Sequence, residues 1–90
     1  MGERRYGFVG IVVERSTPAP GGPIQAILSE YAGIIQGRMG LPHLENGTIS
    51  VITLIVHATT DEIGGLTGKL GLLPGVSVKS ALAKLPSKQA

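Results

Sequence analysis

The sequence lacks cysteine altogether and contains few aromatic and few charged residues. A chain without cysteine forms no disulfide, holds no zinc through thiolates and ligates no iron–sulfur cluster. Its aromatic residues are only Tyr6, Phe8 and Tyr31, too few to indicate a stacking platform for single-stranded nucleic acid. Charged residues make up 16% and hydrophobic residues 42% of the chain. This composition is too apolar for disorder and poor in charge for the surface of a small monomer.

Signals for export or membrane insertion are also missing. A short apolar run follows residues 1–5 and ends at Glu14 and Arg15, so no signal peptide of the usual length fits. No stretch reaches the ~18 apolar residues of a membrane span. We therefore expect a cytoplasmic protein without membrane contact. The net charge of +2 comes partly from basic residues near both ends, which indicates solvated tails rather than a surface for nucleic acid.

The longest pattern is the run from Thr48 to Ala58, which predicts one long strand because Val and Ile fit a pleated, packed surface. Strand side chains alternate between two faces. One face carries Ile49, Val51, Thr53, Ile55 and His57, and the other carries Ser50, Ile52, Leu54, Val56 and Ala58. Both faces are mostly apolar, so the strand needs cover on both sides. A chain this short has few elements to supply that cover, and the pattern therefore predicts self-association.

The residues before this run predict two strands and a helix. Residues 6–14 form an apolar strand in which Gly7 and Gly10 are tolerated only where another group approaches closely. A loop rich in proline and glycine leads to Pro23, which suits the first turn of a helix. That helix has one apolar face, formed by Ile24, Ile27, Leu28 and Tyr31. Gly33 is predicted to cap its C-terminus, and residues 34–41 form a weaker strand suited to a sheet edge.

The residues from Glu45 onward predict a hairpin, a second helix and a last strand. Asn46-Gly47 is a strong hairpin signal because both residues tolerate positive φ. Residues 59–62 supply cap candidates and negative charge for a helix N-terminus. The buried face of this helix is predicted to consist of Ile63, Leu66, Leu70 and Leu73. Pro74-Gly75 ends the helix, and residues 76–80 alternate as a strand with one wet face.

This order, β-α-β-β-α-β, predicts an α+β, ferredoxin-like fold. Its sheet has four antiparallel strands, with the first and third in the centre, and two helices on one face. We expect one domain, 1–90, with a core at about residues 6–80 and a tail at about 85–90. The face without helices exposes either the apolar set of Ile49, Val51, Thr53 and Ile55 or its opposite-parity partners. A contiguous patch of this kind indicates an interface, and the first set is our candidate oligomer interface.

Four segments carry a resemblance to a known family. They are residues 63–71 (IGGLTGKLG), 74–79 (PGVSVK), 38–42 (RMGLP) and 11–14 (IVVE). Together they resemble the small ACT-like family of iron-only hydrogenase system regulators, over about residues 6–80, most specifically in residues 63–71. The resemblance implies a fold related to ACT domains and to the C-terminal domain of the nickel-responsive repressor. It also implies assembly as dimers or tetramers and a response to small ligands. The first loop departs most from the family, being longer and richer in proline and glycine.

The candidate ligand-binding residues fall into three groups. They are Arg15, Ser16, Thr17, Gly21 and Gly22 in the first loop, Gly37, Arg38 and Gly40 in the second strand, and Gly64 and Gly68 in the second helix. A loop before a helix N-terminus can close over a small anion. Arg38 either holds an anionic effector or protects a sheet edge from mispairing. Two interpretations of the helix glycines, together with Gly71, are possible. They let a ligand or a partner helix approach closely, or they let the helix pack tightly within the chain.

Chemistry of other kinds has little support in the sequence. His43 and His57 stand alone, and a metal site would need both of them, or symmetry mates, with a carboxylate such as Glu45. No local motif suggests a nucleophile with its base, so we expect no enzymatic activity and no cofactor. No helix-turn-helix or ribbon-helix-helix pattern precedes Tyr6, so we expect no direct contact with nucleic acid.

The sequence therefore predicts a non-enzymatic regulatory domain that acts as a homodimer or homotetramer. Its small-molecule effector would lie in clefts between subunits, and binding would favour one subunit arrangement over another. Two alternatives remain open at this point. One is an assembly module that joins partner proteins and has no effector, and the other is a metal sensor that uses His43 and His57.

Overall fold

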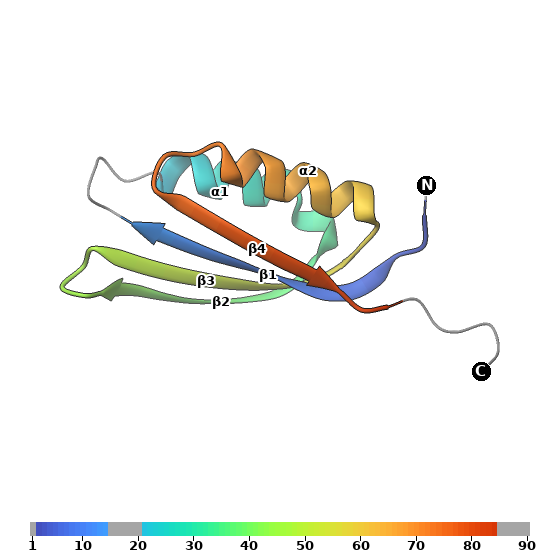
Figure 1. Cartoon of the computed structure of the whole chain (residues 1–90), viewed down its shortest axis with the longest axis horizontal. Coiled ribbons are helices and arrows are strands. Elements are labelled where there is room, and N and C mark those ends of the chain that lie inside the picture. Colours follow the sequence, from blue (N-terminus) through green and yellow to red (C-terminus); the bar gives the residue numbers. More distant parts are fainter. Residues whose placement is uncertain (1, 15–20, 85–90) are drawn as a thin grey trace.

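A computed structural model describes residues 2–14 and 21–84 of the chain. Four strands and two helices follow one another in the order predicted for a ferredoxin-like fold (Figure 1). The elements are β1 (Arg5–Glu14), α1 (Gly21–Glu30), a short 3₁₀ helix η1 (Ala32–Ile34), β2 (Ile35–Leu44), β3 (Ile49–Ala58), α2 (Thr60–Gly71) and β4 (Val76–Leu82). The first loop and the C-terminal tail predicted from the sequence lie outside the described residues, apart from the end of the loop.

The strands form one antiparallel sheet in the order β2-β3-β1-β4, so the prediction that the first and third strands are central is confirmed. Both helices pack on the same face of the sheet (Figure 1). Within this layer α2 contacts β4, and α1 lies beside β2, to which Gln25 and Arg38 link it. The helices thus leave the opposite face of the sheet without cover from the described part of the chain.

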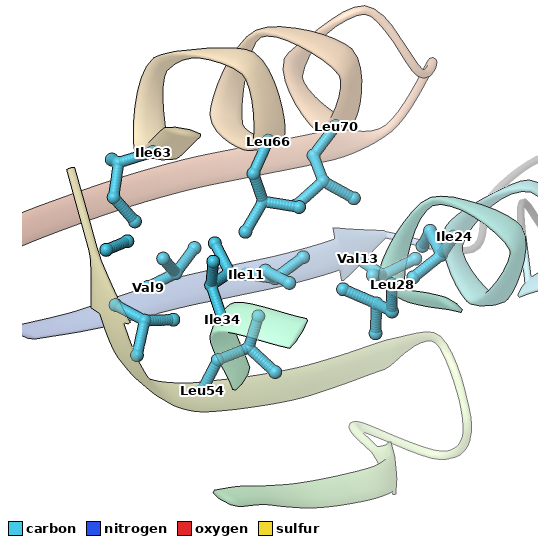
Figure 2. Close-up of a cluster of buried hydrophobic side chains, with 12 residues drawn as sticks. Val9, Ile11, Val13, Ile24, Leu28, Ile34, Leu54, Ile63, Leu66 and Leu70 are labelled. Carbon is cyan, nitrogen blue, oxygen red and sulfur yellow. The ribbon is translucent and has the colours of Figure 1, made fainter. Parts of the chain in front are cut away.

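The core lies between the helices and the sheet, and Figure 2 shows its aliphatic side chains converging from all of these elements. The sheet contributes alternate residues of its central strands, and each helix contributes one stripe. The members are Val9, Ile11, Val13, Ile24, Leu28, Ile34, Leu54, Val56, Ala58, Ile63, Leu66 and Leu70. Helical periodicity predicted Ile63, Leu66 and Leu70 of this core correctly. The predicted end of the second helix at Pro74-Gly75 was wrong, because α2 ends at Gly71 and Leu73 lies beyond it, only partly buried.

The N-terminus of α2 carries the capping arrangement that its sequence predicts. The Thr59 hydroxyl accepts a hydrogen bond from the Glu62 backbone N–H at 3.1 Å, and the Glu62 carboxylate accepts one from the Thr59 backbone N–H at 2.9 Å. This reciprocal pair satisfies two backbone donors that a helix start leaves free. None of the helices among residues 2–14 and 21–84 is long and apolar enough to cross a membrane.

Two local expectations need correction. Gly33 does not cap α1, because the helix ends at Glu30 and Gly33 lies inside η1 without positive φ. β2 extends three residues beyond the predicted end at Leu41, since a bulge accommodates Pro42 and His43, with His43 at φ 61°. The hairpin signal is confirmed, with φ values of 58° for Asn46 and 87° for Gly47.

Candidate functional site

The face of the sheet opposite the helices, hereafter the open face, carries most of the exposed large hydrophobic residues in the described part of the chain. Of the eight exposed large hydrophobic residues, seven lie on it, and only Leu72 lies elsewhere. The seven are Tyr6, Phe8, Val12, Met39, Leu41, Leu44 and Ile55. Contiguous apolar patches of this kind are uncommon on monomers and mark interaction surfaces.

Strand register decides which set of residues β3 presents on the open face. Leu54 and Val56 are fully buried under the helices, whereas Ile55 between them is 49% exposed. The face therefore carries the set of Ile49, Val51, Thr53, Ile55 and His57, which includes the four residues predicted as an interface. Whether a second copy contacts them stays a prediction.

Neighbouring strands extend this apolar surface on both sides of β3. Phe8 pairs with Ile55 and Val12 with Val51 across β1, while Met39 and Leu41 pair with Thr53 and Val51 across β2. Sequence reasoning did not name these β1 and β2 residues. Their parity in β1 and β2 could have been deduced from β3, because directly opposite residues of an antiparallel pair lie on one face.

The open face has few polar groups. By register its formally charged side chains are Glu14 on β1 and Lys79 on β4, which have opposite signs. At one end the ring of Tyr6 stacks on that of His57, with centroids 4.2 Å apart and planes inclined by 17°. This cross-strand stack occupies the flat side of the imidazole and gives His57 a packing role.

A second feature is a hollow between α1 and β2, with a volume of about 220 Å³. Leu28, Ser29, Ala32, Ile35 and Arg38 line it. Arg38 is paired with buried Leu54 and so leaves the sheet on the helix side, where Nη1 donates a long hydrogen bond of 3.4 Å to Gln25 Oε1. The hollow thus combines an apolar lining with one guanidinium.

The predicted ligand-binding residues do not form one cluster within the chain. Gly37, Arg38 and Gly40 lie on β2, at one edge of the sheet, and Gly21 and Gly22 begin α1. Gly64 and Gly68 lie on α2, which contacts β4 at the opposite edge. Arg15, Ser16 and Thr17 lie outside the described residues.

The glycines of α2 correct one of the two readings given above. A Cβ at Gly64, Gly68 or Gly71 would meet nothing within 4 Å, so these residues do not serve tight packing inside the chain. Gly65 does, because a Cβ there would lie 2.6 Å from the hydroxyl of Tyr31. Periodicity selected the wrong glycines because it does not say on which side the neighbouring helix lies.

The two histidines cannot share one metal ion within a chain. His57 pairs with Tyr6 at one end of β3, and His43 lies in the bulge opposite the other end. The seven residue-to-residue steps from 50 to 57 separate these ends by roughly 23 Å at the usual strand rise. Among residues 2–14 and 21–84, no group of three or more His, Asp or Glu side chains is arranged to hold a metal.

Comparison with known families matches residues 5–80 to the TM1266-like family, whose description proposes a role as an iron-only hydrogenase system regulator. Among solved structures the chain is similar to protein TM1266 from Thermotoga maritima. The TM-score is 0.82 at 32% sequence identity, over 91% of this chain and 100% of that one. No curated protein sequence matches the chain.

More distant structures share the fold. The ACT domain from the GTP pyrophosphokinase of Chlorobium tepidum has a TM-score of 0.70 at 21% identity, over 87% of this chain and 99% of that one. The regulatory subunit of aspartate kinase from Thermus flavus has a TM-score of 0.58 at 13% identity, over 87% of this chain and 52% of that one. At these identities the likeness establishes an ACT-like fold.

Proposed function

The chain belongs to the TM1266-like family of iron-only hydrogenase system regulators, and from this premise we propose that it is a non-enzymatic regulatory module that acts as a homo-oligomer. The open face forms the contact between copies. A small-molecule effector, held on the α1–β2 side of the sheet, shifts the balance between subunit arrangements. The family supports the regulatory part of this proposal, and the open face carries the oligomeric part.

The size of the open face suits a stable contact. Three strands of ten residues and one of seven span roughly 33 by 19 Å at ordinary strand rise and spacing. Side chains project from this area of about 600 Å², so its accessible surface approaches the ~800 Å² per partner of a standard interface. Full burial of an exposed aliphatic side chain contributes about 1.5–3 kcal/mol, and the aliphatic residues of the open face, which are 38–68% exposed in one copy, would gain the corresponding part of it.

A second copy of the chain is the occupant that this surface fits best. Association through one shared patch, related by a twofold axis, requires a surface that complements itself. The open face meets this condition because it is apolar across β1, β2 and β3 and because its two formal charges, on Glu14 and Lys79, cancel. Such a face does not repel its own copy through like charges.

Sedimentation velocity at several micromolar concentrations tests the proposal. We expect the wild-type chain to sediment as a dimer or larger species and Ile55→Asp to sediment as a monomer, since a carboxylate in an apolar contact loses its water without gaining a partner. Leu72→Asp is the matched control, because Leu72 is 84% exposed and lies off the open face. A monomeric wild-type chain, or equal effects of the two variants, would contradict the proposal.

A further inference from the structure

We propose that the hollow between α1 and β2 binds a small monocarboxylate with a short apolar group, whose carboxylate pairs with Arg38. This assignment names a chemical class for the effector and therefore rests on the proposed function for its regulatory meaning. The binding site itself rests on three independent observations, namely the pairing state of Arg38, the lining of the hollow and its size.

Arg38 is a cation without an anionic partner among the described residues. All six acidic residues of the chain are described, and two of them hold other cations: Glu62 pairs with Arg4 and Glu30 with Lys69. Arg38 has only the 3.4 Å hydrogen bond to the neutral amide of Gln25. A guanidinium has five N–H donors in a planar fork that matches a carboxylate, so most of its donors remain for a ligand.

The remainder of the hollow suits a short hydrocarbon group. Leu28 and Ile35 come from the edge of the core, Ala32 adds a methyl group, and Ser29 supplies the one hydroxyl among the lining side chains. The volume of about 220 Å³ lies below the ~300–1,000 Å³ of pockets for drug-sized molecules. A ligand of a few carbon atoms therefore fits, with its carboxylate at Arg38 and its hydrocarbon group over Leu28 and Ala32.

The charge of the lining favours a monocarboxylate over a zwitterion or an inorganic anion. The lining residues include one cation and no carboxylate, so the ammonium group of a zwitterion would lose water without meeting an anionic partner. Phosphate or sulfate would leave the apolar lining unused. By contrast, the hollow near the start of α2 includes Glu30 and Glu62 beside Arg4, which makes it unsuitable for an anion. The α1–β2 hollow is thus selective for a monoanion with an apolar end.

Titration of the full-length chain with butyrate, followed by NMR of backbone amides and by calorimetry, tests this site. We expect butyrate to shift the amides of Ser29, Ala32 and Ile35. Uncharged butyramide and zwitterionic 2-aminobutyrate should bind at least about tenfold more weakly, because the charge-assisted pair is lost or opposed. Arg38→Gln should weaken butyrate binding by about the same factor, and Ala32→Leu should block it by filling the hollow.

Arg5→Gln is the matched control, because Arg5 is another arginine whose guanidinium donates to a neutral acceptor, the carbonyl of Ala83. It should leave butyrate affinity unchanged. Absence of butyrate binding, shifts that map to another surface, or equal affinity in wild type and Arg38→Gln would each overturn the assignment. Butyrate binding by a wild-type chain that sediments as a monomer would support this site and refute the proposed oligomer, so the two failures are distinguishable.

Discussion

Gly7 pairs with Leu82 across β1 and β4, and its missing side chain leaves room for the backbone of β4. A Cβ at Gly7 would overlap the carbonyl oxygen of Ala81 and lie 2.8 Å from Leu82 Cδ2. At Gly10, on the opposite face of β1, the nearest such atom is the Lys79 carbonyl oxygen at 3.9 Å. The expectation that a glycine here needs a close neighbour thus applies to Gly7 and not to Gly10.

We predict that Gly7→Ala lowers the free energy of unfolding by about 1–3 kcal/mol, because β4 must shift to accommodate the methyl group. Gly10→Ala should change it by no more than about 0.5 kcal/mol. Urea unfolding of both variants at one fixed protein concentration measures the difference. Equal losses in the two variants would mean that β4 is not held against Gly7 as described.

At the scale of single elements, the start of α2 links stability to pH. The backbone hydrogen bond from Thr59 lowers the pKa of Glu62 below its ordinary value of 4.5, and the nearby charge of Arg4 lowers it further. A carboxyl group whose pKa is depressed by folding stabilises the folded state above its unfolded pKa. This contribution is lost as the pH falls through the lower folded pKa.

We therefore predict that Glu62→Gln is less stable than wild type at neutral pH and that the gap closes as the pH falls below 4.5. Glutamine keeps the hydrogen-bonding shape of the capping box but has no charge for Arg4 or for the helix dipole. Urea unfolding at a series of pH values gives the gap directly. A gap that stays constant down to the most acidic pH would show that the charge of Glu62 does not contribute.

The sequence predicted the helices and strands better than it predicted the surfaces that they form together. The central position of β1 and β3 followed from the β-α-β-β-α-β order, and residues 59–62 were predicted to supply the N-terminal cap of α2, although the reciprocal Thr59–Glu62 capping box was not named. The exposed face of β3 did not follow, because Leu54 and Ile55 are equally apolar. Only the position of the helices decides between them, and that depends on connections far apart in sequence. The Arg38 hollow was missed in part for the same reason, since Ser29 and Ala32 join Arg38 only after α1 packs beside β2.

At the scale of the whole molecule, the central strands of the sheet are apolar on both faces, but the two helices cover only one of these faces. The helix-covered face contains the buried core, and the open face holds seven of the eight exposed large hydrophobic residues. If a second copy covers that face, association and folding are coupled, because a partner that binds only the folded chain stabilises it by mass action. The folding stability then depends on protein concentration, whereas the stability of a monomer is independent of it.

We predict that the melting temperature of the wild-type chain rises by about 3–6 °C for each tenfold increase in protein concentration, as expected for a small domain that unfolds from a dimer. Ile55→Asp should melt at a lower temperature that does not depend on concentration, because its exposed face no longer pairs. Leu72→Asp, which carries the same charge change away from the open face, should keep the wild-type dependence. Thermal unfolding followed by circular dichroism distinguishes these cases. A wild-type melting temperature that is independent of protein concentration would mean that the open face contacts solvent rather than a second copy. Folding stability depends on protein concentration only when folding is coupled to association.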